Sequence, residues 1–225
     1  MGAFHFFMQN DITTRIVLIR HGETAWNAER RLQGHLDIDL NTEGVRQARA
    51  LAAALAREHF DVLVSSDLAR AAQTAKAVAE VLDLPLYIDG RLRERCYGGF
   101  EGLLYAEIAE RFPAEFAAWQ GRDIDGALPP GENRGETFRQ FYDRVIPAIL
   151  GWAADNPGKS LALVAHGGVL ECAYRAALDL PLDTPRDFKV HNASINRFIV
   201  QDGKLKLESW GEVAHLQPVV LDDVG

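Results

Sequence analysis

The sequence predicts an α/β protein with three layers, in which a mostly parallel central sheet lies between two layers of helices. Two observations lead to this class. Short apolar runs alternate along the chain with longer segments whose apolar residues recur at helical spacing. The length of 225 residues and the hydrophobic fraction of 48% suit one soluble domain that buries a full core.

In the N-terminal half, a tail over residues 1–14 precedes an alternation of strands and helices. The apolar runs predict strands at residues 16–19, 61–65 and 85–89, and the helical periodicity predicts helices at residues 42–59 and 67–82. In the first of these helices, Asn41 or Thr42 is the expected cap. Its expected apolar stripe consists of Val45, Ala48, Ala52 and Leu55.

In the C-terminal half, three more helical segments and three more strands are expected. The helices are 105–120 (broken near Pro113), 136–155 (kinked at Pro147) and 167–178, with a Gly- and Pro-rich loop at 123–134. The strands are 161–165, 195–200 and 204–210. The last two flank "QDGK", which is typical of a hairpin turn.

Charge and cysteine content exclude several classes of function. The formal net charge of −8 argues against a protein that binds nucleic acid or an anionic membrane, because either partner requires a basic face. Cys96 and Cys172 lie in no metal-binding or disulfide pattern, which favours free thiols in a reducing cytoplasm. The first residues lack the basic segment and cleavage site of a signal peptide. We therefore expect a cytoplasmic protein.

Polar residues follow three of the predicted strands at the point where each strand ends. Arg20 and His21 follow the first, Arg70 opens the helix after the second, and His166 follows the strand at 161–165. The carboxyl ends of parallel strands meet at one edge of a sheet, so these four side chains are expected in one crevice. Each also has an ordinary structural explanation. A lone histidine there is often a cap, and Arg70 could pair with Asp67.

Two arginines and two histidines around one point are suited to binding phosphate. The guanidinium fork matches phosphate oxygens, and nearby arginines keep a histidine neutral and therefore nucleophilic. No HExxH motif, Walker loop or acidic Mg²⁺ cluster is present, so we expect no metal and no cofactor. A general acid is also required. Glu94 follows the third strand at the same edge, with Glu101 and Glu107 as competitors.

Four stretches together resemble the histidine phosphatase superfamily, whose fold is phosphoglycerate-mutase-like. They are "RHGETAWN", "SSDLARAAQTA", "LRERCYGGFEG" and "VAHGGVL", in that order. The resemblance implies one domain over residues 15–225, with a small helical capping insertion around 103–130.

The resemblance also implies roles for individual residues. It implies that His21 becomes phosphohistidine and that Glu94 is the proton donor and later the base. Arg20, Arg70, His166 and Asn27 would contact the transferred phosphate. Gln33 and Gly34 would line the substrate side, Gly167 would offer a backbone contact, and Asn192 would support the site from behind.

The family contains both phosphatases and phosphoglycerate mutases, and a mutase needs extra cations to hold a bisphosphate. Tyr105 stands where the resemblance implies a mutase lysine, and Gln120 and Gly121 stand where it implies an arginine pair. The capping segment otherwise carries only two cations, Arg111 and Arg122.

We therefore expect a metal-independent phosphomonoester hydrolase that acts on a small phosphorylated metabolite, as a monomer or homodimer. Mutase activity is the alternative, although "ERCYGG" is close to the mutase form. A non-catalytic phosphate-binding module is a third. Four apolar residues of the cap could favour substrates with an apolar or sugar part, or could be helix core: Phe112, Phe116, Trp119 and Leu128.

Overall fold

The computed structural model describes residues 13–217. Its centre is a six-stranded sheet with the order β3-β2-β4-β1-β5-β6. The bounds of these strands are β1 Thr14–Arg20, β2 Val62–Ser65, β3 Leu86–Ile88, β4 Ser160–Ala165, β5 Ile195–Gln201 and β6 Lys204–Glu212. The first four pair in parallel, and β5 and β6 pair antiparallel. The predicted mostly parallel sheet is confirmed.

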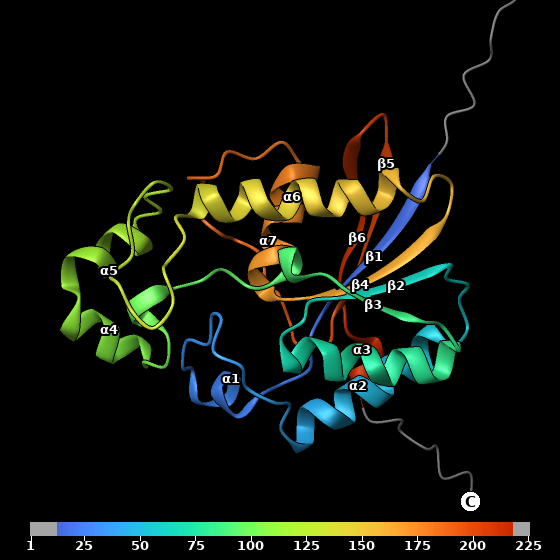
Figure 1. The fold of residues 1–225 in the computed structure, drawn as a ribbon, viewed down its shortest axis with the longest axis horizontal. Helices are drawn as coiled ribbons and strands as arrows, with labels where there is room; N and C mark the ends of the chain where they lie inside the picture. The colour runs from blue at the N-terminus through green and yellow to red at the C-terminus, as the bar shows by residue number, and fades with distance from the viewer. Residues whose placement is uncertain (1–12, 218–225) are drawn as a thin grey trace, which may run out of the picture.

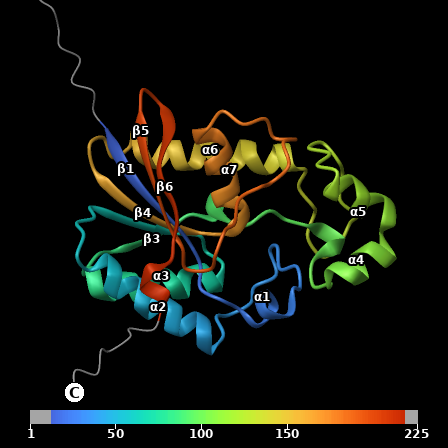
Figure 2. The ribbon, with the colours of Figure 1, turned by 180° about the vertical axis from the view of Figure 1, so that it is seen from behind.

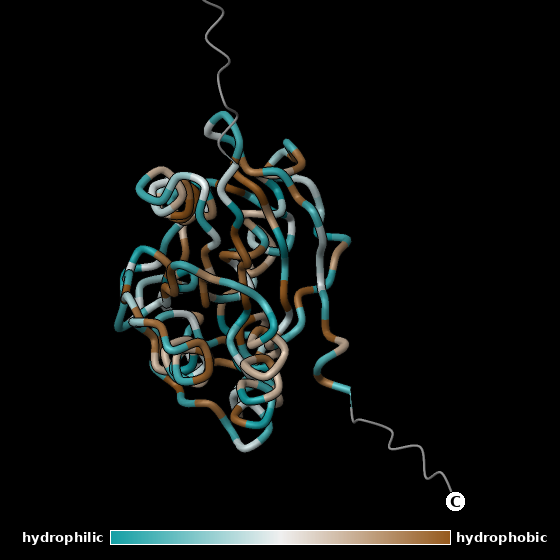
Figure 3. The backbone as a smooth tube through the Cα atoms, turned by 90° about the vertical axis from the view of Figure 1, so that its right-hand side faces the viewer, coloured by the Kyte–Doolittle hydropathy of each residue, from teal (hydrophilic) through white to brown (hydrophobic). Residues whose placement is uncertain are grey.

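Helices cover both faces of this sheet and complete three layers (Figures 1 and 2). One face carries α2 (Thr42–Leu55) and α3 (Ala69–Leu82), and the other carries α6 (Phe138–Ala154) and α7 (Gly167–Ala177). Alternate residues of β1 pack on opposite faces of the sheet. Ile16 and Leu18 pack with α6 and α7, and Val17 and Ile19 pack with α2 and α3. The strands therefore run as apolar segments through the middle of the molecule (Figure 3).

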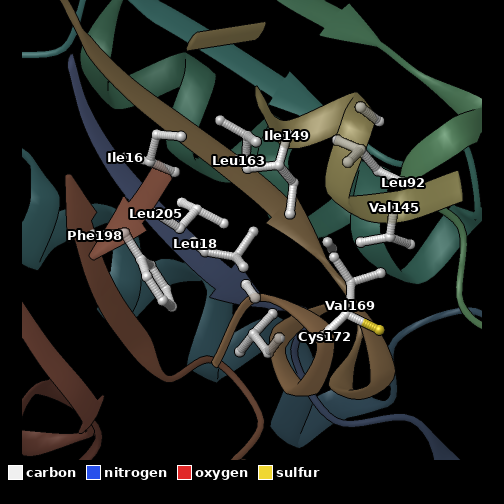
Figure 4. Packing of buried hydrophobic residues seen from close by; sticks show 14 of the residues in the cluster. Ile16, Leu18, Leu92, Val145, Ile149, Leu163, Val169, Cys172, Phe198 and Leu205 are labelled. Carbon is white, nitrogen blue, oxygen red and sulfur yellow. The ribbon is translucent and has the colours of Figure 1, made fainter. Parts of the chain in front are cut away.

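The larger of the two cores lies between the sheet and the pair α6 and α7 (Figure 4). Leu163 of β4 and Phe198 of β5 belong to this core together with Val145 and Ile149 of α6, all at 0–1% exposure. Full burial of side chains of this size contributes about 1.5–3 kcal/mol each. This packing fixes the sheet edge from which the polar residues emerge.

Three short elements lie beyond one end of the sheet (Figure 1). They are α1 (Ala25–Glu29), α4 (Tyr105–Arg111) and α5 (Pro113–Gln120). The break that Pro113 predicted is present, because Pro113 opens α5 after α4 has ended. Five apolar residues between positions 103 and 130 pack against a small separate core of Leu32, Phe100 and Ile108. They are Leu103, Phe112, Phe116, Trp119 and Leu128.

Several predicted boundaries were wrong. Helix α2 ends at Leu55 rather than at residue 59, because the chain turns there to bury Phe60 and to pair Glu58 with Arg197. Val45 is 39% exposed and leaves the expected apolar stripe, whose place Leu51 takes. The helix α1 was not predicted.

The chain termini and the last hairpin bear on the remaining predictions. Strand β1 begins at Thr14, one residue inside the expected tail, and residues 1–12 lie outside the described part. The expected hairpin is present, with Asp202 and Gly203 at φ 53° and 71° in its turn.

Helix α6 runs through Pro147 without interruption. Within residues 13–217, no helix has the length and apolar character that crossing a bilayer demands.

Candidate active site

The strand register brings the two histidines together. Arg20 of β1 pairs with Ala165 of β4, and the N–H of His21 donates to the carbonyl of Ala165 at 3.0 Å. His166 is the next residue, so the two imidazole rings lie 5.2 Å apart between centroids. They are 3% and 0% exposed. Two residues separated by most of the chain thus become neighbours at the carboxyl edge of the sheet.

His21 has a defined tautomer. Its Nδ1 lies 2.6 Å from the carbonyl oxygen of Gly22, which can only accept, so Nδ1 carries the proton. The lone pair is then on Nε2. Burial lowers the pKa of His21 well below 6.5, and the charges of Arg70 and Arg20 lower it further. A buried, neutral imidazole with a free Nε2 is a competent nucleophile.

His166 is held from behind by Ser66. Its Nε2 lies 2.8 Å from the Ser66 hydroxyl, which also accepts the backbone N–H of Leu68. When the hydroxyl donates to Nε2, the ring proton is on Nδ1. That atom is buried and has no protein partner in the part of the chain that the structure describes. Burial lowers the pKa of His166 well below 6.5, with further lowering by Arg70 and by His21.

Arg70 does not pair with Asp67, although such a pair was the ordinary structural explanation for an arginine at this position. Asp67 pairs instead with Arg93, at 2.7 Å between Oδ1 and Nε. The two terminal nitrogens of Arg70 donate to the carbonyls of Gly34 and Leu36, at 2.8 and 3.1 Å. Burial lowers the pKa of Arg70 to about 10, which leaves it a cation at neutral pH.

Four buried side-chain atoms lack a hydrogen-bond partner among residues 13–217, and all four belong to residues predicted for the site. They are Nε of Arg20, Nε of Arg70, Oε1 of Gln33 and Nδ1 of His166. Buried polar groups of folded proteins are nearly always satisfied, so exceptions need an explanation. Two of these groups, the Nε–H of Arg20 and that of Arg70, belong to residues that line one pocket. The Nδ1 of His166 is a third donor when Ser66 donates to Nε2. An oxyanion would satisfy such donors.

Asn27 is oriented by its own hydrogen bonds. Its Oδ1 accepts from the backbone and the hydroxyl of Thr24, at 3.1 Å each, and from Asn192 at 3.3 Å. The amide nitrogen is therefore left to donate into the pocket that Asn27 lines. Asn192 also donates to the carbonyl of His21 at 3.1 Å. Asn192 thus supports both residues from behind.

Glu94 is the carboxylate at the edge of the site, and backbone groups hold it at both oxygens. Oε1 accepts the N–H of Arg95 at 2.8 Å, and Oε2 accepts the N–H of Gly168 at 3.0 Å. The competitors are occupied elsewhere. Glu101 accepts the backbone N–H groups of His35 and Tyr97, and Glu107 caps α4 through the N–H of Leu104. Only Glu94 of these three lines the pocket.

The pocket has a volume of about 170 Å³, and every predicted site residue except His166 lines it: Arg20, His21, Asn27, Gln33, Gly34, Arg70, Glu94 and Gly167. A larger cavity of about 610 Å³ adjoins it, and the two share Tyr97, Tyr105, Gly168, Glu171 and Arg186. Trp119, Gln120 and Gly121 also line this larger cavity, whereas Phe112, Phe116 and Leu128 do not. Those three residues are core.

Sequence reasoning missed Arg186 and Glu171. Arg186 belongs to the loop between α7 and β5, where no periodicity or motif marks it. Glu171 lies on α7 among apolar residues, five positions after His166, and that spacing was an available signal. In the described residues, no group of three or more His, Cys, Asp or Glu side chains is arranged to hold a metal ion.

The fold and this pocket define a class: phosphoglycerate-mutase-like α/β proteins, as comparison with solved structures confirms. The chain belongs to branch 1 of the histidine phosphatase superfamily, whose sequence profile matches residues 16–213. It is accordingly an enzyme of the phosphatase type.

Three similar proteins illustrate the range of the family. A metal-independent phosphoserine phosphatase of Arabidopsis thaliana is 39% identical over 208 residues, covering 92% of this chain and 84% of the relative. Phosphoglycerate mutase-like protein 4 of the same plant is 38% identical over 205 residues, covering 90% and 86%. A mycobacterial glucosyl-3-phosphoglycerate phosphatase, solved with VO3, superposes with a TM-score of 0.77 at 32% identity, covering 88% of this chain and 99% of that one.

Proposed function

We propose that the protein hydrolyses phosphate monoesters of small metabolites without a metal ion, through a phosphohistidine on His21. The observation that carries this proposal concerns three side-chain nitrogens near His21: Nε of Arg20, Nε of Arg70 and Nδ1 of His166. All three are buried and have no hydrogen-bond partner within residues 13–217. Donors fixed in a buried site stabilise the charge of a phosphoryl group in transfer.

In the first step, Nε2 of His21 attacks phosphorus, and the bond from phosphorus to the ester oxygen breaks. Glu94, protonated in the enzyme–substrate complex, gives its proton to the leaving alcohol. The Nδ1 hydrogen bond to Gly22 disperses the positive charge that develops on the ring. Arg20 and Arg70 neutralise the phosphoryl oxygens.

In the second step, a water molecule attacks the phosphohistidine. The Glu94 carboxylate takes one proton from this water, the new P–O bond forms, and the P–Nε2 bond breaks. Inorganic phosphate leaves, His21 is again neutral, and Glu94 is again protonated. Each residue returns to its starting state after one ester has consumed one water.

The substrate is a small molecule because the two adjoining cavities, of about 170 and 610 Å³, suit a phosphoryl group and a modest alcohol portion. The relatives named for phosphoserine and glucosyl-3-phosphoglycerate support a small phosphorylated metabolite. Segment 103–130 serves as the cap over this site.

The test is a panel of phosphate esters assayed with EDTA present, for the wild type, His21→Ala and the control His59→Ala. His59 is a histidine at the surface, 83% exposed. We expect the wild type and His59→Ala to release phosphate, and His21→Ala to lose several orders of magnitude in kcat. Equal turnover by His21→Ala would refute the assigned nucleophile, and inhibition by EDTA would refute metal independence. Binding without any turnover would favour a phosphate-binding module.

A further inference from the structure

The larger cavity, which the alcohol portion of a substrate would enter, contains a cation cluster that the chemistry at His21 does not use. Glu171 of α7 is its centre, with a side chain only 9% exposed. Arg122 and Arg175 donate to its Oε1, and Nη1 of Arg186 lies 3.6 Å from its Oε2. Three guanidinium groups therefore surround a single carboxylate.

Arg175 holds the loop that carries Arg186. It is fully buried, and its terminal nitrogens donate to the carbonyls of Pro181 and Thr184 at 2.9 and 2.8 Å. It lines neither cavity. Its hydrogen bonds instead attach the start of that loop to α7, so the position of Arg186 is fixed by a buried residue.

Arg122 and Arg186 both line the larger cavity, and Glu171 holds both guanidinium groups against its wall. Arg186 also lines the phosphate pocket, and its side chain is 39% exposed. The positive charge of Arg186 also acts on Arg20 of that pocket. Burial is the main cause of the lowered pKa of Arg20, and the charge of Arg186 lowers it further. Arg186 therefore stands between the phosphate site and the cavity.

The charge balance of the larger cavity favours a carboxylate over a second phosphate. Its lining contains three arginines (Arg95, Arg122 and Arg186) and three carboxylates (Asp123, Glu171 and Asp183), so its formal charge is zero. A second phosphate would bring about two negative charges into this neutral wall, and a carboxylate brings one. The planar guanidinium fork matches a carboxylate bidentately.

We propose that Arg186, supported by Arg122, binds a carboxylate on the alcohol portion of the substrate. This inference rests on the proposed phosphatase function and narrows its substrate class to phosphorylated hydroxy acids. Because Arg186 borders both cavities, the carboxylate is only a few bonds away from the phosphate ester. The stacked pair of Tyr105 and Trp119, 5.6 Å between ring centroids, forms another wall of the cavity beside the alcohol portion.

The test compares esters that differ only at the carboxylate. The pairs are 3-phosphoglycerate with glycerol 3-phosphate, and phosphoserine with phosphoethanolamine. The wild type is expected to prefer the carboxylated member of at least one pair about tenfold or more in kcat/KM, as for a charged hydrogen bond. Arg186→Gln is expected to remove this preference, because it should lower kcat/KM for the carboxylated member about tenfold more than for the partner without the carboxylate. Arg111→Gln, a cap arginine that lines neither cavity, is the control.

Three results would overturn the proposal while leaving the phosphatase assignment intact. The first is a wild type that hydrolyses both members of each pair equally, a measurement that depends on no variant. The second is an equal loss for both members in Arg186→Gln. The third is a preference for bisphosphorylated esters, which would assign the cluster to a phosphate. Failure of the proposed function itself is distinct, because the wild type would then hydrolyse neither these esters nor p-nitrophenyl phosphate.

Discussion

The backbone N–H of Gly168 donates to Oε2 of Glu94 at 3.0 Å, which joins the first turn of α7 to the loop after β3. The same glycine leaves room for the carboxylate. A Cβ added at Gly168 would lie 2.2 Å from Oε1 of Glu94, well inside contact distance. The residue two positions after His166 thus sets where the proposed acid stands.

Gly168→Ala is therefore expected to displace Glu94 and to lower kcat by about 100-fold, the cost of a misplacement of about 1 Å. Gly151→Ala is the control, since a Cβ added at this glycine of α6 would meet nothing within 4 Å. Steady-state kinetics on both variants, with circular dichroism to verify folding, is the measurement. Equal activity of the two variants would show that the position of Glu94 does not matter.

Glu94→Gln removes the proton donor, and the resulting loss of rate should depend on the acidity of the leaving alcohol. Loss of a general acid costs about 10²–10⁴ in rate for an ester of a poorly acidic alcohol. Nitrophenolate needs no proton to leave, so p-nitrophenyl phosphate should suffer a much smaller loss in the phosphorylation step. Pre-steady-state rates for the two esters measure the difference. Glu107→Gln should behave as wild type, and a loss in Glu94→Gln that is the same for both esters would argue against acid catalysis.

The buried histidines predict a stability that declines in acid. The pKa values of His21 and His166 lie well below 6.5 because both are buried beside Arg70. Below about pH 6.5 the unfolded chain binds protons that the folded protein does not, so the free energy of unfolding falls by up to about 1.4 kcal/mol per pH unit for each histidine. Above that pH the two histidines do not change the free energy of unfolding as the pH varies.

Urea unfolding between pH 7.5 and pH 5.5 measures this slope. The double variant His21→Asn/His166→Asn should unfold with a smaller pH dependence than the wild type, whatever its absolute stability. An unchanged slope would mean that both imidazoles take up protons in the folded protein as readily as in the unfolded chain.

Phosphate transfer back to a bound product should be absent. Tyr105 and Gln120, both uncharged, line the larger cavity where the family resemblance implies cations in a mutase. With 3-phosphoglycerate and a bisphosphoglycerate primer, we expect inorganic phosphate and no 2-phosphoglycerate above the enzyme-free background. Conversion that depends on the primer would assign the protein to the mutase side of the family.

The sequence predicted the convergence of Arg20, His21, Arg70 and His166 because one physical rule suffices. Parallel strands end at a common edge, and the observed register of β1 against β4 places Arg20 opposite Ala165, the residue before His166. The identity of the acid was not decided by the residues alone. Glu94, Glu101 and Glu107 differ in what their carboxylates bond, which only tertiary structure reveals.

Arg186 lay beyond prediction for a different reason. Its position depends on the buried pair of Arg175 and Glu171 and on carbonyls of an irregular loop, none of which has a periodic signature. The short helix α1 also has no periodic signature in the sequence. It is a single turn that Thr24 and Asn27 cap reciprocally, too brief for an apolar stripe. The polar residues that orient a site are thus less predictable than the strands that carry it.

The most direct test of the account is to trap the phosphoenzyme. The wild type, mixed with a phosphate ester in EDTA and quenched within milliseconds, is digested and examined by mass spectrometry under conditions that preserve phosphohistidine. We predict an acid-labile phosphoryl group on the peptide that contains His21, formed at the rate of alcohol release and absent from His21→Ala. A phosphoryl group on another residue, or rapid turnover with none on His21, would contradict the proposed mechanism.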